Sequence, residues 1–285
     1  LAFDPRVAEA VANAYRLYKI ACGANAADYN WTEVLMKRAG GMMNGLSLHY
    51  YTVYDWGRKG SATQFDDEDW YAAVGRCAQI GNIIKGHCDI MDRYDPARRI
   101  GLIVDEWGTW WDEEPGTVRG HLYQQNTLRD AMVAAVSLNI FHKYVYRVKM
   151  ANIAQAVNVL QAVVLTDGAQ MVLTPTFYAF ELYKAHQGAR LLKSELIAGE
   201  KDGLPVAHES SSVQADGSIT TTICNPSAGD ALPMRTVIAG KHVSLRSADL
   251  LAGDIHAHND FEEGNAVAIA PFEGIKVAYE GEDTV

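Results

Sequence analysis

The chain has 285 residues, of which 48% are hydrophobic and 21% are charged, a composition typical of globular proteins with a substantial core. Its formal net charge is −10, and no basic stripe could neutralise phosphates, which argues against nucleic acids and anionic membranes as partners. No apolar run reaches the roughly 18 residues that a membrane span requires.

Short apolar runs alternate with helical patterns through the first two-thirds of the chain. The pattern predicts strands over 17–22, 45–52, 100–107 and 147–155. It predicts helices over 66–93, 124–141 and 176–187. The first helix opens on four acidic residues, which favour the positive end of a helix dipole, and Thr174-Pro175 is typical of a helix start. Such alternation indicates a parallel sheet covered by helices, and periodicity alone leaves a barrel and a doubly wound sheet open.

The sequence pattern changes after residue 189. Short β-rich runs, broken by Gly, Pro, Asn and Asp, then predict an antiparallel sandwich. We therefore expect two domains, 1–189 and 190–285. The four cysteines, Cys22, Cys77, Cys88 and Cys224, are scattered and form no C-x-x-C pair, so we expect free, buried thiols in a reducing compartment.

Polar and aromatic residues collect where the predicted strands end. His49 and Tyr51 follow the second strand, Asp105 and Glu106 the third, and Gln155 the fourth. In both candidate architectures, ligands bind at the carboxyl ends of the strands. Carboxylates and amides bind hydroxyl groups and tryptophan rings stack on sugars, and the chain places Trp107, Trp110 and Trp111 beside the acids. The pattern thus indicates a sugar site.

Each of these residues also has a structural interpretation. An acid of the Asp105-Glu106 pair could cap a helix or join an ion pair, His49 could be a structural histidine, and the tryptophans could pack in the core. Their coincidence at successive strand ends favours the functional interpretation. The spacing of His49, His87, His121 and His142 gives no metal-ligand pattern, and no P-loop, G-x-G-x-x-G or G-x-S-x-G motif is present, so we expect neither metal nor cofactor.

Several motifs in one order resemble the α-L-arabinofuranosidases of glycoside hydrolase family 51. They are "GLSLHYYT", "VDEWGTWW", "RVKMANIAQAVNVLQAV" and "LTPTFYAFELYKAHQ", and the likeness covers roughly residues 15 to 190. The resemblance implies an α/β plus all-β protein, in which the C-terminal half of a (β/α)8 TIM barrel (strands five to eight) precedes a jelly-roll-like β-sandwich. It also implies a cytoplasmic location and a homo-oligomer.

The family's activity is the retaining release of terminal non-reducing α-L-arabinofuranosyl groups from arabinose-containing oligosaccharides and polysaccharides. Carried over by motif, Glu106 matches the nucleophile, and His49 and Tyr51 match the pair that hydrogen-bonds the catalytic carboxylates. Trp110 matches an aromatic residue lining the sugar site, and Gln155 matches a glutamine that contacts substrate hydroxyls. Asp105 receives no chemical role from the match, and we expect it to point away from Glu106 and to support the structure.

The chain departs from the family at the acid/base residue. That glutamate follows an asparagine in the family, and no Asn-Glu dipeptide occurs in these 285 residues. We therefore expect the C-terminal part of a longer enzyme, inactive in isolation for want of its proton donor. Two alternatives remain open: a related retaining glycosidase of the β-xylosidase or endoglucanase type, and a non-catalytic carbohydrate-binding remnant.

Overall fold

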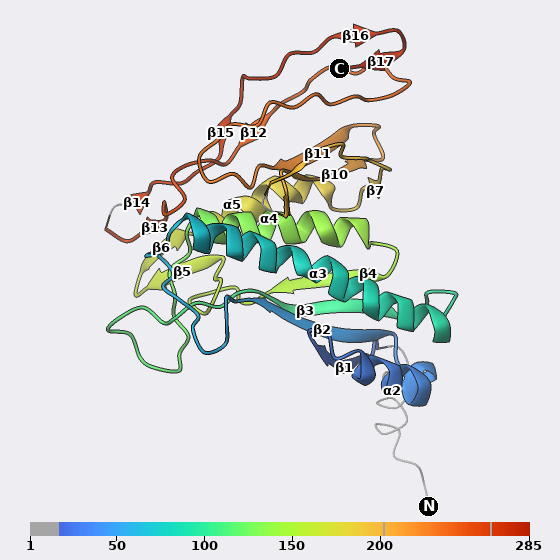
Figure 1. The fold of residues 1–285 in the computed structure, drawn as a ribbon, viewed down its shortest axis with the longest axis vertical. Coiled ribbons are helices and arrows are strands. Elements are labelled where there is room, and N and C mark those ends of the chain that lie inside the picture. The colour runs from blue at the N-terminus through green and yellow to red at the C-terminus, as the bar shows by residue number, and fades with distance from the viewer. Residues whose placement is uncertain (1–16, 202, 263) are drawn as a thin grey trace, which may run out of the picture.

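A four-stranded parallel sheet forms the base of the molecule in the computed structural model, which describes residues 17–201, 203–262 and 264–285 (Figure 1). Its strands are neighbours in chain order, β1-β2-β3-β4, and every pair is parallel. Their bounds are β1 Ile20–Asn25, β2 Gly45–Thr52, β3 Gly101–Thr109 and β4 Val148–Ile153. All four predicted strands are therefore present, with β1 shifted toward the C-terminus by about three residues. Residues 1–16 of the predicted first domain lie outside the described residues.

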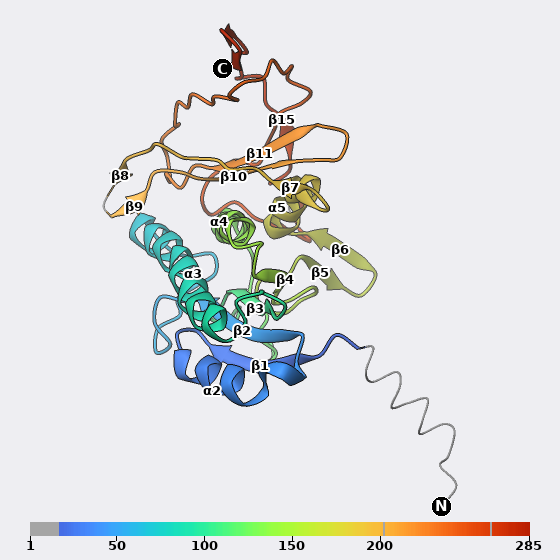
Figure 2. The same ribbon diagram turned by 90° about the vertical axis from the view of Figure 1, so that its right-hand side faces the viewer.

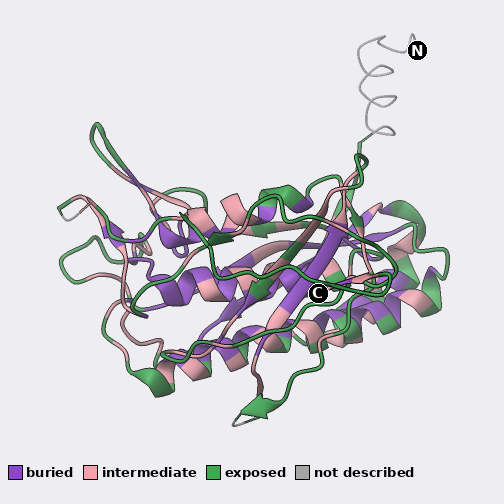
Figure 3. Cartoon of the chain, turned by 90° about the horizontal axis from the view of Figure 1, so that it is seen from above, coloured by how far each residue is buried: buried purple, intermediate pink, exposed green. Residues whose placement is uncertain are grey.

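The helices between the strands pack along one face of this sheet (Figure 2). They are α2 Tyr29–Ala39, α3 Asp67–Tyr94 and α4 Leu128–Lys143, and a short turn η1 Gly40–Met42 follows α2. A single core cluster joins their apolar residues to Leu46, Leu48, Leu102 and Val104 of the two central strands. Figure 3 shows buried residues concentrated in the strands and in the inward faces of the helices. The opposite face of β2 and β3 is left for polar side chains.

The strand order argues against one of the two architectures that the sequence leaves open. A doubly wound sheet reverses its order at a switch point, whereas these four strands follow one another without reversal. The described residues form an open sheet and no closed barrel. Sequential order with helices along one face is the arrangement of consecutive β/α units in a barrel wall.

Local signals set most helix boundaries. Asp66 caps α3 by accepting a hydrogen bond from the Asp69 amide, as its acidic start predicts. The second predicted helix corresponds to α4, which begins at Leu128 rather than at 124, because Thr127 and Asp130 form a capping box. The third predicted helix is confirmed as α5 Pro175–Tyr183, with Thr174 as its N-cap, and continues as the 3₁₀ turn η2 Lys184–His186.

The C-terminal region is antiparallel but has less regular strand structure than the sequence predicts. A three-stranded sheet combines β7 Arg190–Leu191, β10 His208–Val213 and β11 Ile219–Cys224. The other pairs there are short, with bounds β8 Glu200–Lys201, β9 Leu204–Pro205, β12 Asp249–Leu250, β13 Asn259–Asp260, β14 Gly264–Asn265, β15 Ala270–Pro271, β16 Tyr279–Glu280 and β17 Asp283–Thr284. Before α5, a separate antiparallel pair joins β5 Val164–Asp167 and β6 Gln170–Leu173. The β-rich runs over 233–250 form only an isolated bridge at Ile238 and the two-residue strand β12.

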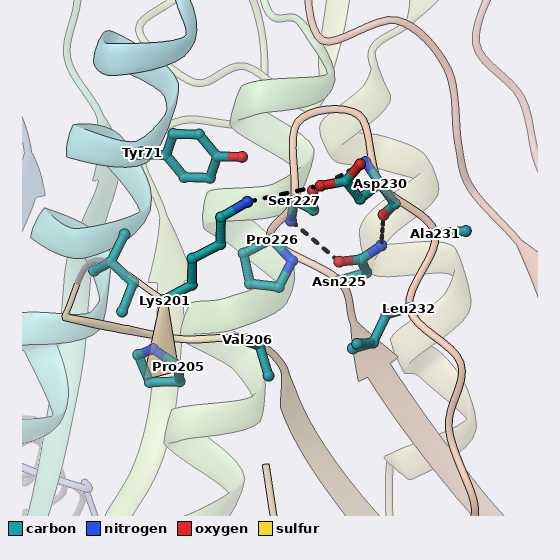
Figure 4. A pocket seen from close by; sticks show the side chains of 11 residues that line it. Tyr71, Lys201, Pro205, Val206, Asn225, Pro226, Ser227, Asp230, Ala231 and Leu232 are labelled. Atoms are coloured by element: carbon teal, nitrogen blue, oxygen red, sulfur yellow. Dashed lines mark hydrogen bonds and ion pairs between the residues drawn. The ribbon is translucent and has the colours of Figure 1, made fainter. Parts of the chain in front are cut away.

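The β-rich region is joined to α3 through both apolar and polar contacts. The buried Trp70 indole donates a hydrogen bond to the Pro226 carbonyl at 2.8 Å. Beside it lies a cavity of about 150 Å³, lined in part by Tyr71, Lys201 and Asp230 (Figure 4). The amide of Asn225, which also lines it, is already bonded to the Asp230 carbonyl and the Ser227 amide. The cavity thus lies between α3 and the β-rich region, where the two pack against each other.

The described residues contain no helix long and apolar enough to cross a bilayer. Their cysteines are all free thiols. Cys77, Cys88 and Cys224 are buried as expected, whereas Cys22 is exposed on the edge strand β1, because edge positions face solvent.

Candidate active site

An extra residue in β3 determines how the acids are presented. Strand pairing matches Ser47 with Ile103 and then His49 with Glu106, so two residues of β3 oppose one of β2. This is a β-bulge. Val104 and Trp107 both belong to the helix-side core although they are three residues apart, which strict alternation forbids. The bulge therefore leaves both intervening acids on the opposite face.

Two side chains of the neighbouring strand contact the Glu106 carboxylate. The Tyr51 hydroxyl donates a hydrogen bond to Oε1 of Glu106 at 2.6 Å, and Nδ1 of His49 lies 3.0 Å from Oε2. The side chains of Glu106 and His49 are each 40% exposed, so the carboxylate is fixed in direction and still reachable from solvent.

Tyr51 is suited to remain a hydrogen-bond donor. Burial raises its pKa well above the ordinary value for a phenol, and the hydrogen bond to Glu106 raises it further. The hydroxyl therefore keeps its proton throughout the physiological range. Its ring packs edge-on against Trp110, with the centroids 4.9 Å apart.

Asp105 does not point away from the site, contrary to the expectation from the sequence. Its Oδ1 accepts a hydrogen bond from the Ser47 hydroxyl at 2.6 Å and lies 3.3 Å from Nε2 of His49. The bulge is the physical reason, because it places two consecutive acids on one face of the sheet. His49 consequently bridges Asp105 and Glu106.

The three tryptophans after the acids have different environments. Trp107 and Trp111 are each 1% exposed and pack in the core, Trp107 against Phe141 and Trp111 against Tyr54. Trp110 is half-buried. It forms an aromatic wall with Tyr51 and with the exposed Trp56, whose ring centroid is 5.5 Å away. Nζ of Lys59 lies 4.6 Å from the Trp110 ring centroid, in the range of a cation–π contact.

Gln155 lies two residues beyond β4, at the same end of the sheet as the acids. The preceding residue, Ala154, donates its amide to the Trp107 carbonyl at 2.8 Å, which ties this segment to the end of β3. The Gln155 side chain is exposed, and among the described residues no hydrogen bond joins it to His49, Tyr51 or Glu106. The structure thus brings four predicted residues into contact and places the fifth nearby.

A buried polar network supports the segment that carries Trp110, and the sequence analysis missed it. Gln161 accepts a hydrogen bond from the Thr109 amide, and Gln124 accepts one from the Trp111 amide, both at 2.8 Å. Asp130 accepts a third from the Trp111 indole at 2.9 Å. The only sequence signal was the Thr127–Asp130 capping box, because the glutamines contact the segment from distant loops.

The Glu106 carboxylate thus lies at the ends of parallel strands, bonded by the Tyr51 hydroxyl and close to the aromatic wall that includes Trp110. Residues 105–284 match the family model for the α-L-arabinofuranosidase C-terminal domain, and the chain belongs to that family.

Named relatives agree with this assignment. The chain is 49% identical, over 92% of its length and 52% of the relative's, to an intracellular exo-α-L-arabinofuranosidase of Bacteroides ovatus. It is 25% identical, over 90% of its length and 40% of the relative's, to an intracellular exo-α-(1→5)-L-arabinofuranosidase of Streptomyces lividans. The crystal structure of the GH51 arabinofuranosidase from Xanthomonas axonopodis pv. citri superposes with a TM-score of 0.81 at 39% identity, covering 93% of this chain and 55% of that one. The chain spans about half the length of the curated relatives it matches.

Proposed function

We propose that this chain carries the nucleophile side of a retaining α-L-arabinofuranosidase active site, with Glu106 as the nucleophile. The observation that carries the proposal is the placement of Tyr51 and His49 against the two oxygens of a solvent-accessible carboxylate, to which the Tyr51 hydroxyl donates a hydrogen bond. The substrate would be a terminal non-reducing α-L-arabinofuranosyl group, in keeping with the names of the relatives. Trp110 and Gln155 would contact the sugar.

The chemistry follows from the retaining mechanism. An oxygen of Glu106 attacks the anomeric carbon while the bond to the leaving oxygen breaks, and a carboxylic acid gives that oxygen a proton. Water, deprotonated by the same group, then displaces Glu106 and releases the sugar with its configuration retained. Tyr51 and His49 would hold the Glu106 carboxylate in place before the attack.

The proton donor is the part that these residues do not supply. The chain contains no Asn-Glu dipeptide, and we infer that the acid comes from outside the 285 residues. Parallel strands in uninterrupted order support the related proposal that this sheet is half of a (β/α)8 barrel wall. A break between η2, which ends at His186, and β7, which begins at Arg190, supports a domain boundary near 189, with a jelly-roll-like sandwich after it. The word "intracellular" in the relatives' names supports a cytoplasmic location, and a homo-oligomer remains part of the proposal.

The test exploits a leaving group that needs no acid. An aryl α-L-arabinofuranoside with a strongly acidic phenol should arabinosylate Glu106 in the purified chain, seen as a mass shift on the peptide containing β3. Glu106→Gln should abolish the shift, and Glu195→Gln, at an exposed loop position, should not. Labelling that persists in Glu106→Gln, or no labelling at all, would contradict the proposal.

A further inference from the structure

Asp105 has contacts that the nucleophile's role does not explain. It accepts the Ser47 hydroxyl at 2.6 Å and faces Nε2 of His49 at 3.3 Å. The other ring nitrogen of His49 faces Glu106 at 3.0 Å. One imidazole is thus held between two carboxylates from consecutive residues, a geometry that depends on the bulge in β3.

Both nitrogens of the His49 ring are therefore in contact with a carboxylate. Because Nε2 faces Asp105 and Nδ1 faces Glu106, the orientation of the ring toward Glu106 depends on the contact on its other side.

We propose that Asp105 is a positioning residue that holds the His49 ring against Glu106. The proposal rests on Glu106 being the nucleophile. Ser47 fixes the Asp105 carboxylate, Asp105 contacts Nε2 of the ring, and Nδ1 then faces Glu106. A carboxylate that orients a functional histidine in this way is a recurring device in enzymes.

The position of His49 also matters during the reaction. Glu106 must stay aimed at the anomeric carbon while its oxygen forms the bond to the sugar. Without the Asp105 contact, the His49 ring is free to turn away from Glu106. Asp105→Asn should therefore slow attack by Glu106 even if the fold is intact.

The first measurement reads the His49 ring directly and needs no turnover. In the ¹⁵N-histidine-labelled chain, long-range proton–nitrogen correlation spectra report the surroundings of each ring nitrogen. We expect the signals of both Nε2 and Nδ1 of His49 to shift in Asp105→Asn, because losing the contact at Nε2 also moves Nδ1 away from Glu106. Asp112→Asn, which removes an exposed carboxylate from the same strand extension, should leave the His49 signals unchanged. Identical His49 signals in Asp105→Asn and the unaltered chain would overturn the proposal.

The second measurement is the rate of Glu106 arabinosylation by the aryl glycoside. We expect Asp105→Asn to lower it by about tenfold or more, the loss typical when the partner of a functional histidine is removed. Ser47→Ala should give a smaller loss, because it frees the carboxylate without removing its charge. If no variant is labelled but the His49 signals respond to Asp105→Asn, the nucleophile assignment fails and the positioning contact stands. If labelling is equal in Asp105→Asn and the unaltered chain, the positioning role fails.

Discussion

Three histidines lie where α4 packs against the C-terminal sheet, and they make the stability of the fold depend on pH. They are His142, His186 and His208. Nδ1 of His142 lies 2.8 Å from the Ser210 hydroxyl, which itself donates to Asn139, so the ring nitrogen is the donor. The His142 and His186 rings are 4.7 Å apart. Burial lowers the pKa of His142 to about 4, and the neighbouring His186 lowers it further. Burial, with a smaller effect of Lys143, likewise lowers the pKa of His208 to about 4.

The sign and size follow from proton linkage. Between about pH 4 and the unfolded value of about 6.5, the unfolded chain binds more protons than the folded one, so stability falls as the pH falls. At about pH 5, a histidine shifted from about 6.5 to about 4 lowers the free energy of unfolding by about 2 kcal/mol relative to neutral pH. His142 and His208 are both partly accessible to solvent, and screening reduces their combined effect to roughly 2 kcal/mol.

Urea denaturation across this window measures the effect. Between about pH 5.5 and 7, most ordinary carboxylates stay ionised, so the slope there reports mainly histidines. His142→Gln, whose amide can still donate to Ser210, should flatten the slope, and the exposed His121→Gln should not. Stability that is constant or rises as the pH falls through this window would refute the reasoning.

Three further predictions concern single side chains. Arg147→Ala should lower the free energy of unfolding by about 3–5 kcal/mol in urea denaturation, because it leaves the buried Asp95 without the guanidinium at 3.0 Å; Arg99→Ala, at an exposed partner of the same acid, should cost far less. Tyr51→Phe should slow aryl-arabinofuranoside labelling of Glu106 without unfolding the chain, and an unchanged labelling rate would contradict the role of its hydroxyl. Gly108→Ala should lower the thermal midpoint, since φ is +137° and a Cβ would lie 3.0 Å from Gln161 Oε1; a midpoint equal to that of Gly116→Ala, at an open turn, would contradict the close contact.

Contacts with distant parts of the chain explain where the sequence predictions ended. The helix predicted over 124–141 begins later in the structure, at Leu128. The polar residues before Leu128 bind the extension of β3 instead of continuing the helix. In the C-terminal region, apolar runs predicted long strands over 233–250, yet only β12 and one bridge form there. A strand requires a partner, and pairing is decided by residues far away in the sequence.

The sequence by itself determined several elements of the parallel sheet and its helices. Periodicity and caps specify β2, β3 and α3, because these signals act within one or two turns or along one strand. It also predicted that His49, Tyr51 and Glu106 lie together, because parallel strands end at a common edge. Only the tertiary structure decided where Asp105 points, since a bulge exists only as a register between β3 and its neighbours.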